Sequence, residues 1–242
     1  MSKIKISVIM PAYNVASYID EAVQSVLKQE GISFELLICD DGSKDDTWDK
    51  IQKHLQNPKV RAWHFPKNRG DARTRNFLIA RAKGKYISCC DADDLFLAGH
   101  LKSLVQVLER NRRIGVVYTN MVEIDQTHPL KKPRLLYRRP GHVRTWDLID
   151  GSISNGATLI RRDLIRKIGG YKKKFHLYAD IDLFFRLSEI TQFHHVSGKP
   201  LYVYRRRPDS LSNQSERRRI LFGRKVLTDA IQRRYQVQFR WS

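Results

Sequence analysis

The chain has only three cysteines, and their placement argues against a disulfide framework. Cys89 and Cys90 are adjacent in one predicted strand, where successive side chains point to opposite faces, and Cys39 lies in another. We interpret all three thiols as small buried apolar groups, which fits a reducing compartment such as the cytoplasm. No spacing resembles a zinc site.

Long hydrophobic runs are also absent. No stretch approaches the roughly 18 consecutive apolar residues of a membrane-spanning helix. Residues 1–10 alternate lysine and isoleucine instead of forming the apolar core of a signal peptide. We therefore expect a cytoplasmic protein. Its 242 residues, 41% of them hydrophobic, are enough to bury the core of one large domain.

Acidic residues are scarce relative to basic ones, with 25 Asp and Glu against 45 Lys and Arg, so the net charge is +20. Residues 205–242 alone hold eleven basic and three acidic side chains. Such an excess points to nucleic acid, an anionic membrane surface or a polyphosphate substrate as partner.

What the sequence does contain is a regular alternation of strand and helix patterns. Apolar runs at residues 4–10, 34–39, 60–65, 86–90 and 115–120 predict strands, and helical periodicity follows most of them. This order predicts an α/β protein with a mostly parallel, Rossmann-like sheet flanked by helices. Helices are also predicted over about 179–189 and 215–235, and residues 126–144 are expected to form a mobile connection.

Two acidic stretches directly follow predicted strands: Cys39-Asp40-Asp41-Gly42-Ser43 and Cys90-Asp91-Ala92-Asp93-Asp94. Ligands of open α/β sheets bind at the carboxyl ends of the strands. An Asp-x-Asp there suits a divalent cation that is also held by substrate phosphates. Either stretch alone could simply be a turn, but the two together favour a nucleotide-diphosphate site.

Further motifs accompany these acidic stretches in a fixed order. They are Ser7-Val8-Ile9-Met10-Pro11-Ala12-Tyr13-Asn14, Asn68-Arg69-Gly70, Gly169-Gly170-Tyr171, Ala179-Asp180-Ile181-Asp182-Leu183 and Leu201-Tyr202-Val203-Tyr204-Arg205. With them the chain, from about residue 5 to 212, resembles the family 2 inverting glycosyltransferases of the GT-A fold, of the bacterial cell-surface polysaccharide type.

The resemblance implies a domain plan and an activity. Residues 1–212 would form the GT-A domain, with 1–120 binding the nucleotide sugar and 121–212 the acceptor, and 213–242 would form a basic amphipathic helical extension. The activity implied is metal-dependent inverting transfer of a sugar from a UDP-sugar, or a dTDP-sugar, to a hydroxyl of a saccharide or lipid-linked saccharide.

The resemblance also implies a nucleotide pocket. Tyr13 would stack on or flank the base, and Asp41 would accept the imide N–H of uracil or thymine. From the residues alone, Tyr13 could instead pack against the next helix, Asp41 could cap a helix, and Arg75 could be an exposed helical arginine. The residues that the resemblance assigns to nucleotide-sugar binding are Pro11, Ala12, Tyr13, Asn14, Asp41, Arg75, Asp91, Ala92, Arg206 and Arg207.

For the reaction itself the resemblance implies two carboxylates. Asp93 would hold Mn²⁺ or Mg²⁺, which neutralises charge on the departing diphosphate, while Asp94 would cap the next helix. Asp180 would be the base that accepts the proton of the acceptor hydroxyl, and Asp182 would hold the architecture. Without the resemblance, Asp180 could simply stabilise a helix N-terminus.

The chain departs from the family pattern at two positions. Ala179 stands where a Glu is usual, which leaves the acceptor class open. Arg207 stands where a His often helps to bind metal or diphosphate, and an arginine cannot ligate a cation. Either the metal has one protein ligand fewer here, or Arg206 and Arg207 stabilise the leaving group. A solvated basic turn is the alternative.

Two other functions compete with this interpretation. A sugar nucleotidyltransferase would carry a Gly-rich phosphate loop after the first strand, where this chain has Pro11-Ala12-Tyr13-Asn14. A nucleic-acid-binding module would interleave aromatic and basic residues, so we expect no specific nucleic acid partner. The basic tail either lies on an anionic membrane, peripheral on the inner face of the cell membrane, or packs on the core.

Overall fold

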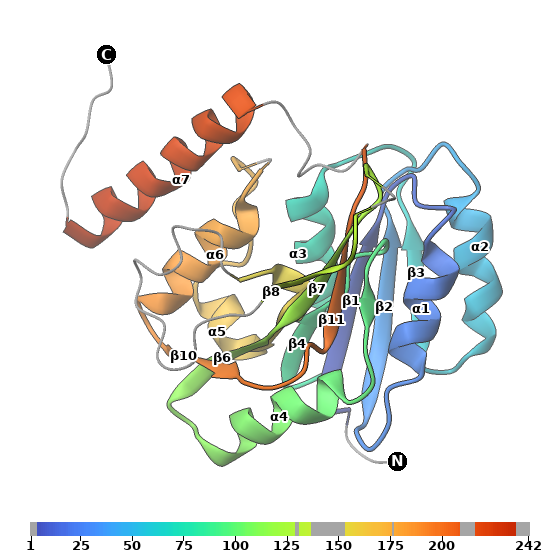
Figure 1. Ribbon diagram of the computed structural model, residues 1–242, viewed down its shortest axis with the longest axis horizontal. Coiled ribbons are helices and arrows are strands. Elements are labelled where there is room, and N and C mark those ends of the chain that lie inside the picture. The colour runs from blue at the N-terminus through green and yellow to red at the C-terminus, as the bar shows by residue number, and fades with distance from the viewer. Residues whose placement is uncertain (1–3, 129–130, 137–152, 176, 209–215, 236–242) are drawn as a thin grey trace.

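The computed structural model describes residues 4–128, 131–136, 153–175, 177–208 and 216–235 (Figure 1). A seven-stranded sheet forms its centre, in the order β10-β6-β9-β4-β1-β2-β3. The strands are β1 (Ile6–Ala12), β2 (Phe34–Asp40), β3 (Val60–His64), β4 (Tyr86–Cys89), β6 (Ile114–Thr119), β9 (Thr158–Arg161) and β10 (Gln192–Val196).

The sheet is mostly parallel, as the sequence predicts, and all five predicted strands are present. β1 pairs in parallel with β2 and β4, β2 with β3, and β10 with β6. The exception is β9, which runs antiparallel between β4 and β6. This four-residue strand has no alternation of apolar and polar residues, so it could not be predicted from the sequence.

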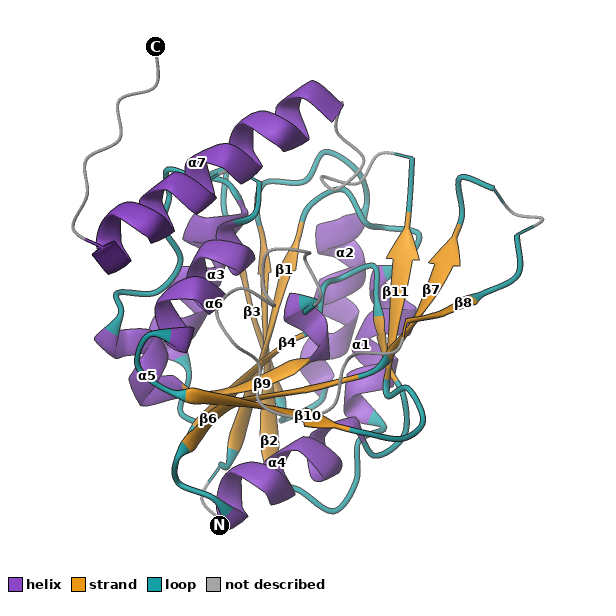
Figure 2. Ribbon diagram, turned by 60° about the vertical axis from the view of Figure 1, so that its left-hand side comes forward, coloured by secondary structure: helices purple, strands orange, loops and turns teal. Residues whose placement is uncertain are grey.

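Helices cover both faces of the sheet, so β1 and β2 are apolar almost throughout. Val8 and Met10 belong to the core beneath α1 (Ile19–Leu27) and α4 (His100–Arg110). Ile9 points the other way, into the core shared with α3 (Asp71–Arg81) and α6 (Ala179–Ser188). The remaining helices of this part are α2 (Thr47–Lys53), η1 (His54–Gln56), η3 (Asn155–Ala157) and α5 (Arg162–Lys167). Figure 2 shows the two helical layers.

The cysteines are buried and free, as the sequence predicts. Burial raises the pKa of the Cys39 thiol to about 12, and nearby Asp41 and Asp40 add to the effect. Burial also raises the pKa of Cys89 and of Cys90, so all three are unreactive thiols at neutral pH.

A second sheet was not anticipated from the sequence. It contains β5 (Leu95–Phe96), β11 (Tyr202–Arg206), β7 (Met121–Asp125) and β8 (Arg134–Leu136), in the order β5-β11-β7-β8. β8 pairs antiparallel with β7, so the expectation of a mobile connection over 126–144 is wrong for residues 134–136, which form a strand. β8 has only three residues and lies in a stretch rich in Pro, Lys and Arg, so it could not be predicted from the sequence. Residues 129–130 and 137–144 lie outside the described part.

The C-terminal helix α7 (Glu216–Tyr235) packs on the domain through its second half. Val226 and Ala230 join the core of α6, and Asp229 pairs with Lys172 at 2.7 Å. Ile220 and Leu221, near the start of the helix, are 50% exposed. Within the described residues, no helix combines the length and apolarity needed to cross a membrane.

Candidate active site

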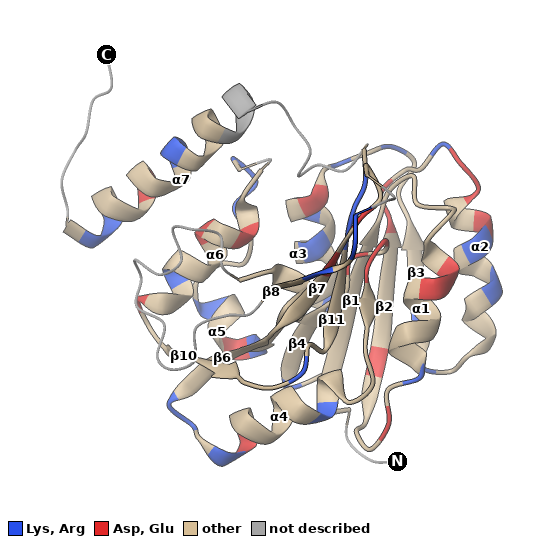
Figure 3. Ribbon diagram, in the orientation of Figure 1, with Lys and Arg blue, Asp and Glu red and all other residues tan. Residues whose placement is uncertain are grey.

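The carboxyl ends of β1, β2 and β4 lie together at one edge of the larger sheet, with the start of α6 and the end of β11 beside them. Figure 3 shows acidic and basic segments meeting between α3, α6 and β11. Because these parallel strands end at the same edge, the residues that follow them lie in one site, and the contact of Arg207 with Asp93 adds the end of β11.

Arg75 lies at the centre of this edge and is buried, so the interpretation as an exposed helical arginine is wrong. Its Nε donates to Asp71 Oδ2 and its Nη2 to Asp91 Oδ1, both at 2.7 Å, and its Nη1 donates to Cys89 Sγ. Burial lowers the pKa of Arg75, but Asp71 and Asp91 raise it well above the usual value. Arg75 is therefore a fixed positive charge, and it holds the first Asp of the Asp-Ala-Asp motif.

Asp93 is paired with the second arginine of the site, Arg207. Arg207 Nε donates to Asp93 Oδ2 at 2.8 Å, and its guanidinium lies over the Tyr18 ring, 5.0 Å from the centroid. Burial and the neighbouring Asp91 raise the pKa of Asp93, and Arg207 opposes them. Arg207 is only 7% exposed, so the alternative of a solvated basic turn is wrong for this residue. Arg206 is half-buried on β11, with Asp125 of β7 as its register partner.

Asp94 does not cap the next helix, and this expectation is corrected. α4 begins at His100, behind Gly99, with no side-chain cap. Asp94 is instead 1% exposed, where it accepts the Tyr202 hydroxyl and, at 2.7 Å, the backbone N–H of Arg205. A buried carboxylate needs such donors. The two hydrogen bonds connect the acidic loop to β11, which ends at Arg206, directly before Arg207.

The loops that would hold the base are tied to each other. The Asn14 N–H donates to Ser43 Oγ, and the Lys44 N–H donates to Asn14 Oδ1, both at 2.9 Å. Pro11 and Ala12 end β1 just before them. Tyr13 is 41% exposed, so its ring is available for stacking.

Asp41 is buried beneath this loop pair. Its Oδ1 accepts the Arg69 N–H at 2.8 Å and its Oδ2 the Gly70 N–H at 2.9 Å. Burial raises the pKa of Asp41, and these two backbone donors oppose it. α2 begins at Thr47, so Asp41 does not cap it. A carboxylate oxygen has two lone pairs, so a base N–H can still be accepted, and that role stays a prediction.

Gly42 explains why the loops can approach so closely. Its φ is +75°, and a Cβ there would come within 2.5 Å of the Lys67 backbone carbonyl carbon. Only glycine fits both requirements. The Asp-Gly-Ser motif is therefore needed for the shape of the site as well as for its charge.

The sequence analysis assigned no individual role to two carboxylates of the site. Asp40 is fully buried, accepting the Ser43 N–H and hydroxyl, with His64 Nδ1 at 2.7 Å from its Oδ2. Asp71 begins α3 and holds Arg75 one turn later. The spacing of four between Asp71 and Arg75 could have revealed that ion pair.

Asp180 lies in the first turn of α6, directly after Tyr178 and Ala179. Tyr178 has a left-handed φ of 62°. Burial raises the pKa of the Asp180 carboxyl to about 6; Arg75 and the Ile181 N–H oppose this, and Asp71 and Asp91 add to it. The side chain keeps some exposure, and it lies within electrostatic reach of the strand-end charges.

Asp182, two residues further, has another role. It is 1% exposed, and its Oδ2 accepts Arg186 Nε at 2.9 Å and Nη2 at 2.6 Å. Lys172 and Arg233 of α7 lie 3.8 Å from its other oxygen. Asp182 therefore stabilises the packing around α6, in agreement with the architectural role expected from the sequence.

The residues of the site could hold a divalent cation only if a bound substrate supplied further ligands to it. Among the described residues, no group of three or more His, Cys, Asp or Glu side chains could hold a metal ion. Asp93 is one carboxylate at a strand end, with one oxygen engaged by Arg207. Mg²⁺ and similar ions are often held by one or two carboxylates plus substrate phosphates, and Asp93 suits that arrangement.

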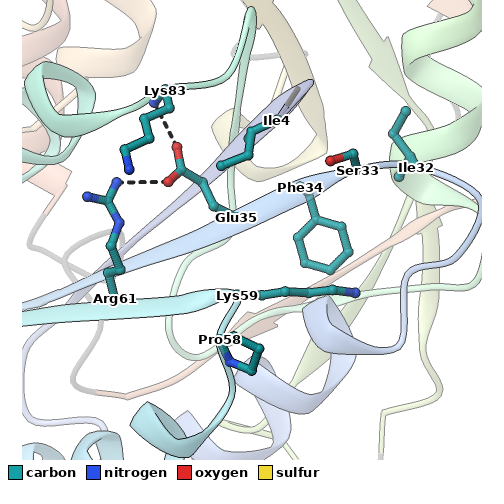
Figure 4. Close-up of a pocket in the computed structure, with 9 residues that line it drawn as sticks. All are labelled: Ile4, Ile32, Ser33, Phe34, Glu35, Pro58, Lys59, Arg61 and Lys83. Atoms are coloured by element: carbon teal, nitrogen blue, oxygen red, sulfur yellow. Dashed lines mark hydrogen bonds and ion pairs between the residues drawn. The ribbon is translucent and has the colours of Figure 1, made fainter. Parts of the chain in front are cut away.

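A hollow at the opposite edge of the sheet does not compete for this function. Figure 4 shows it between the amino ends of the strands, where Lys59 lies over the Phe34 ring. Glu35, in this hollow, accepts hydrogen bonds from Arg61 Nη2 at 2.8 Å and from the Lys83 N–H at 2.7 Å. Its carboxylate is therefore engaged in contacts within the fold.

Comparison with known sequences identifies the family. The sequence profile described as glycosyl transferase family 2 matches residues 7–169. The chain belongs to this family. It is 28% identical over 209 residues to a chondroitin synthase of Pasteurella multocida, an alignment that covers 79% of this chain and 20% of that protein. This family 2 glycosyltransferase chain thus spans about a fifth of that relative's length.

Solved structures agree on the fold. TarS of S. aureus, residues 1–349 in complex with UDP-GlcNAc, superimposes with a TM-score of 0.79 at 19% identity, covering 95% of this chain and 67% of that one. The mannosyltransferase PcManGT of Pyrobaculum calidifontis, in complex with GDP-Man and Mn²⁺, gives 0.67 at 16% identity, covering 98% and 66%. The GT-A fold expected from the sequence is confirmed.

Proposed function

We propose that this family 2 glycosyltransferase moves a sugar from a UDP-sugar to an acceptor hydroxyl with inversion at the anomeric carbon. The observation that carries the proposal is Asp180. Its carboxyl, with a pKa raised to about 6, lies at the site edge near Arg75 and Asp91. A base with a pKa near neutrality can accept a proton and is still ionised at physiological pH.

The proposed reaction is a single displacement. The acceptor oxygen attacks C1 of the sugar on the face opposite the diphosphate, and its proton passes to Asp180. The bond from C1 to the diphosphate oxygen breaks, and its electron pair stays on the nucleoside diphosphate. Inversion follows because attack and departure occur on opposite faces.

Positive charge for the leaving diphosphate comes from the arginines of the site. Arg75 stays protonated because Asp71 and Asp91 hold it, and Arg206 and Arg207 lie at the end of β11. A guanidinium binds phosphate through two parallel N–H donors. A divalent cation, Mn²⁺ or Mg²⁺ held by Asp93, would supply further neutralisation of the developing charge.

The choice of a uridine donor is supported by the base pocket. Asp41 offers an acceptor for an imide N–H and Tyr13 an exposed ring for stacking. TarS was solved with UDP-GlcNAc, whereas PcManGT was solved with GDP-Man, so the fold alone does not select the base. The dTDP-sugars remain the second choice, since thymine has the same N–H.

The acceptor and the location are proposed from the family and from α7. A saccharide or lipid-linked saccharide of a surface polysaccharide or glycolipid fits the glycan-synthase name of the relative above. Ile220 and Leu221 are half-exposed next to exposed Arg224 and Lys225, which suits an anionic membrane surface on the cytoplasmic side. The family assignment supports this activity over that of a nucleotidyltransferase or a nucleic-acid-binding module.

The proposal is tested by calorimetric titration of UDP into the protein, with and without Mn²⁺. We expect binding that strengthens markedly with the metal, after which UDP-sugars are screened for transfer. Binding of GDP but not UDP would contradict the proposed base pocket. Absence of binding for every nucleoside diphosphate would contradict the proposed activity as a whole.

A further inference from the structure

The most informative departure of this chain from its family is Arg207, because it contacts the carboxylate that the metal would need. Its Nε lies 2.8 Å from Asp93 Oδ2, and its guanidinium is 7% exposed against the Tyr18 ring. The ion pair therefore involves a buried arginine that is held by packing. It differs from the transient pairs of surface side chains, which contribute little.

The negative charge of Asp93 is offset by Arg207 in this arrangement. Asp91 is paired with Arg75 and Asp93 with Arg207, so the two carboxylates of the Asp-Ala-Asp motif meet two guanidinium groups. Arg75 is shared between Asp71 and Asp91, so Asp93 is compensated by Arg207 alone, and a divalent cation that approaches Asp93 meets a carboxylate whose charge is already offset. It would also lie within a few ångströms of Arg207, where two positive charges repel each other strongly.

The position of Arg207 is set by the second sheet. Asp94 accepts the Arg205 N–H and the Tyr202 hydroxyl, which fixes the end of β11 next to the acidic loop. The Arg207 guanidinium is thereby held beside Asp93, where a diphosphate that binds next to this carboxylate would meet it.

We propose that Arg207 and the divalent cation compete for Asp93, and that the nucleoside diphosphate resolves the competition. Without donor, Arg207 neutralises Asp93 and keeps the cation out. When the donor binds, its diphosphate accepts bidentate hydrogen bonds from the Arg207 guanidinium. Asp93 is then free to bind the cation. The metal site is thus assembled only together with the donor. This inference rests on the proposed donor binding at this site.

The test measures Mn²⁺ and UDP separately in the full chain. Mn²⁺ binding is followed by the loss of the free-ion electron paramagnetic resonance signal, with and without UDP, and UDP binding by calorimetry in EDTA. The variants are Arg207→Gln, Arg207→His, which restores a metal-ligating side chain, and Arg110→Gln. Arg110 is an exposed residue of α4 and loses the same unit charge far from the site.

We expect two effects of opposite sign. Arg207→Gln should bind Mn²⁺ without nucleotide roughly tenfold tighter than the wild type, because the repelling charge is gone, and Arg207→His tighter still. The same Arg207→Gln should bind UDP in EDTA more weakly. Arg110→Gln should change neither. A purely structural role of Arg207 would weaken both ligands together, and thermal unfolding of each variant checks that it is folded.

Equal Mn²⁺ affinity of the wild type and Arg207→Gln without nucleotide would overturn the proposal, as would unchanged UDP binding in EDTA. If Arg207→Gln is unfolded, Arg207→Leu gives the same comparison, since it removes the charge without adding a metal ligand. If UDP binds to no variant under any condition, the proposed donor site fails, while the Mn²⁺ titrations still decide whether Arg207 excludes the cation.

Discussion

Replacing Asp180 by Asn should abolish transfer and at the same time stabilise the fold. Burial raises the pKa of this carboxyl from 3.8 to about 6, so its charged form is less favourable in the folded chain than in the unfolded one. A shift of about 2 units corresponds to about 3 kcal/mol. Because the side chain keeps some contact with solvent, screening reduces this to about 1–2 kcal/mol.

The sign follows from proton linkage. Between about pH 4 and pH 6 the folded chain binds more protons at Asp180 than the unfolded chain, so the stability of the wild type falls as pH rises through this window. Asn carries no charge at any pH and keeps an oxygen for the Ile181 N–H. The gain of Asp180→Asn should therefore be full above about pH 6 and vanish below about pH 4.

Thermal unfolding followed by circular dichroism measures this gain. For a chain of this size, about 1–2 kcal/mol raises the midpoint by about 3–6 °C. Asp182→Asn is the matched control, since it lies on the same helix but breaks a buried pair with Arg186. It should lose about 3 kcal/mol or more. If Asp180→Asn is no more stable than the wild type at about pH 8, the carboxylate is not desolvated, and the argument for its role as base is refuted.

Four further outcomes are expected. The transfer rate should fall as pH drops through about 6, because protonated Asp180 cannot accept a proton; a rate that stays level down to about pH 5 would exclude it as the base. Tyr13→Ala should weaken UDP binding by about 1–3 kcal/mol in calorimetry, because the ring is proposed to stack on the base, and should leave the unfolding midpoint unchanged, because the side chain is 41% exposed; unchanged affinity would place the base elsewhere. Asp93→Ala should remove the enhancement of UDP binding by Mn²⁺, and a retained enhancement would move the metal to other ligands. Tyr202→Phe should cost about 1–3 kcal/mol of unfolding free energy, because the buried Asp94 loses the hydroxyl that donates to it; an unchanged midpoint would contradict a stabilising role of this hydrogen bond.

Local patterns were sufficient for the elements that are long or strongly apolar. The runs that became β1, β2 and β4 are covered by helices on both faces, and a continuous apolar run is what such burial requires. β8 and β9 have three and four residues, which is too short for any periodicity to show. The pairing of β9 is decided by β4 and β6, which are distant in sequence.

In the candidate site, too, local sequence patterns predict some features and not others. The positions of Asp41, Asp93 and Asp180 could be proposed from ordered motifs, because each motif lies at the end of a strand or the start of a helix. Their partners could not, since Arg207 reaches Asp93 across 114 residues of sequence. Asp94 was misassigned for the same reason: in sequence it precedes a helix, but in space it faces β11.

The sequence by itself determined the family, the order of the strands and helices, and which carboxylates follow which strands, because these depend on local residue patterns. Only the tertiary structure decided that Arg75 and Arg207 each hold one Asp of the Asp-Ala-Asp motif, and that the surroundings of Asp180 raise its pKa. Charge pairing and desolvation depend on distances through space, and the second sheet brings β11 to the acidic loop only when the whole chain is folded.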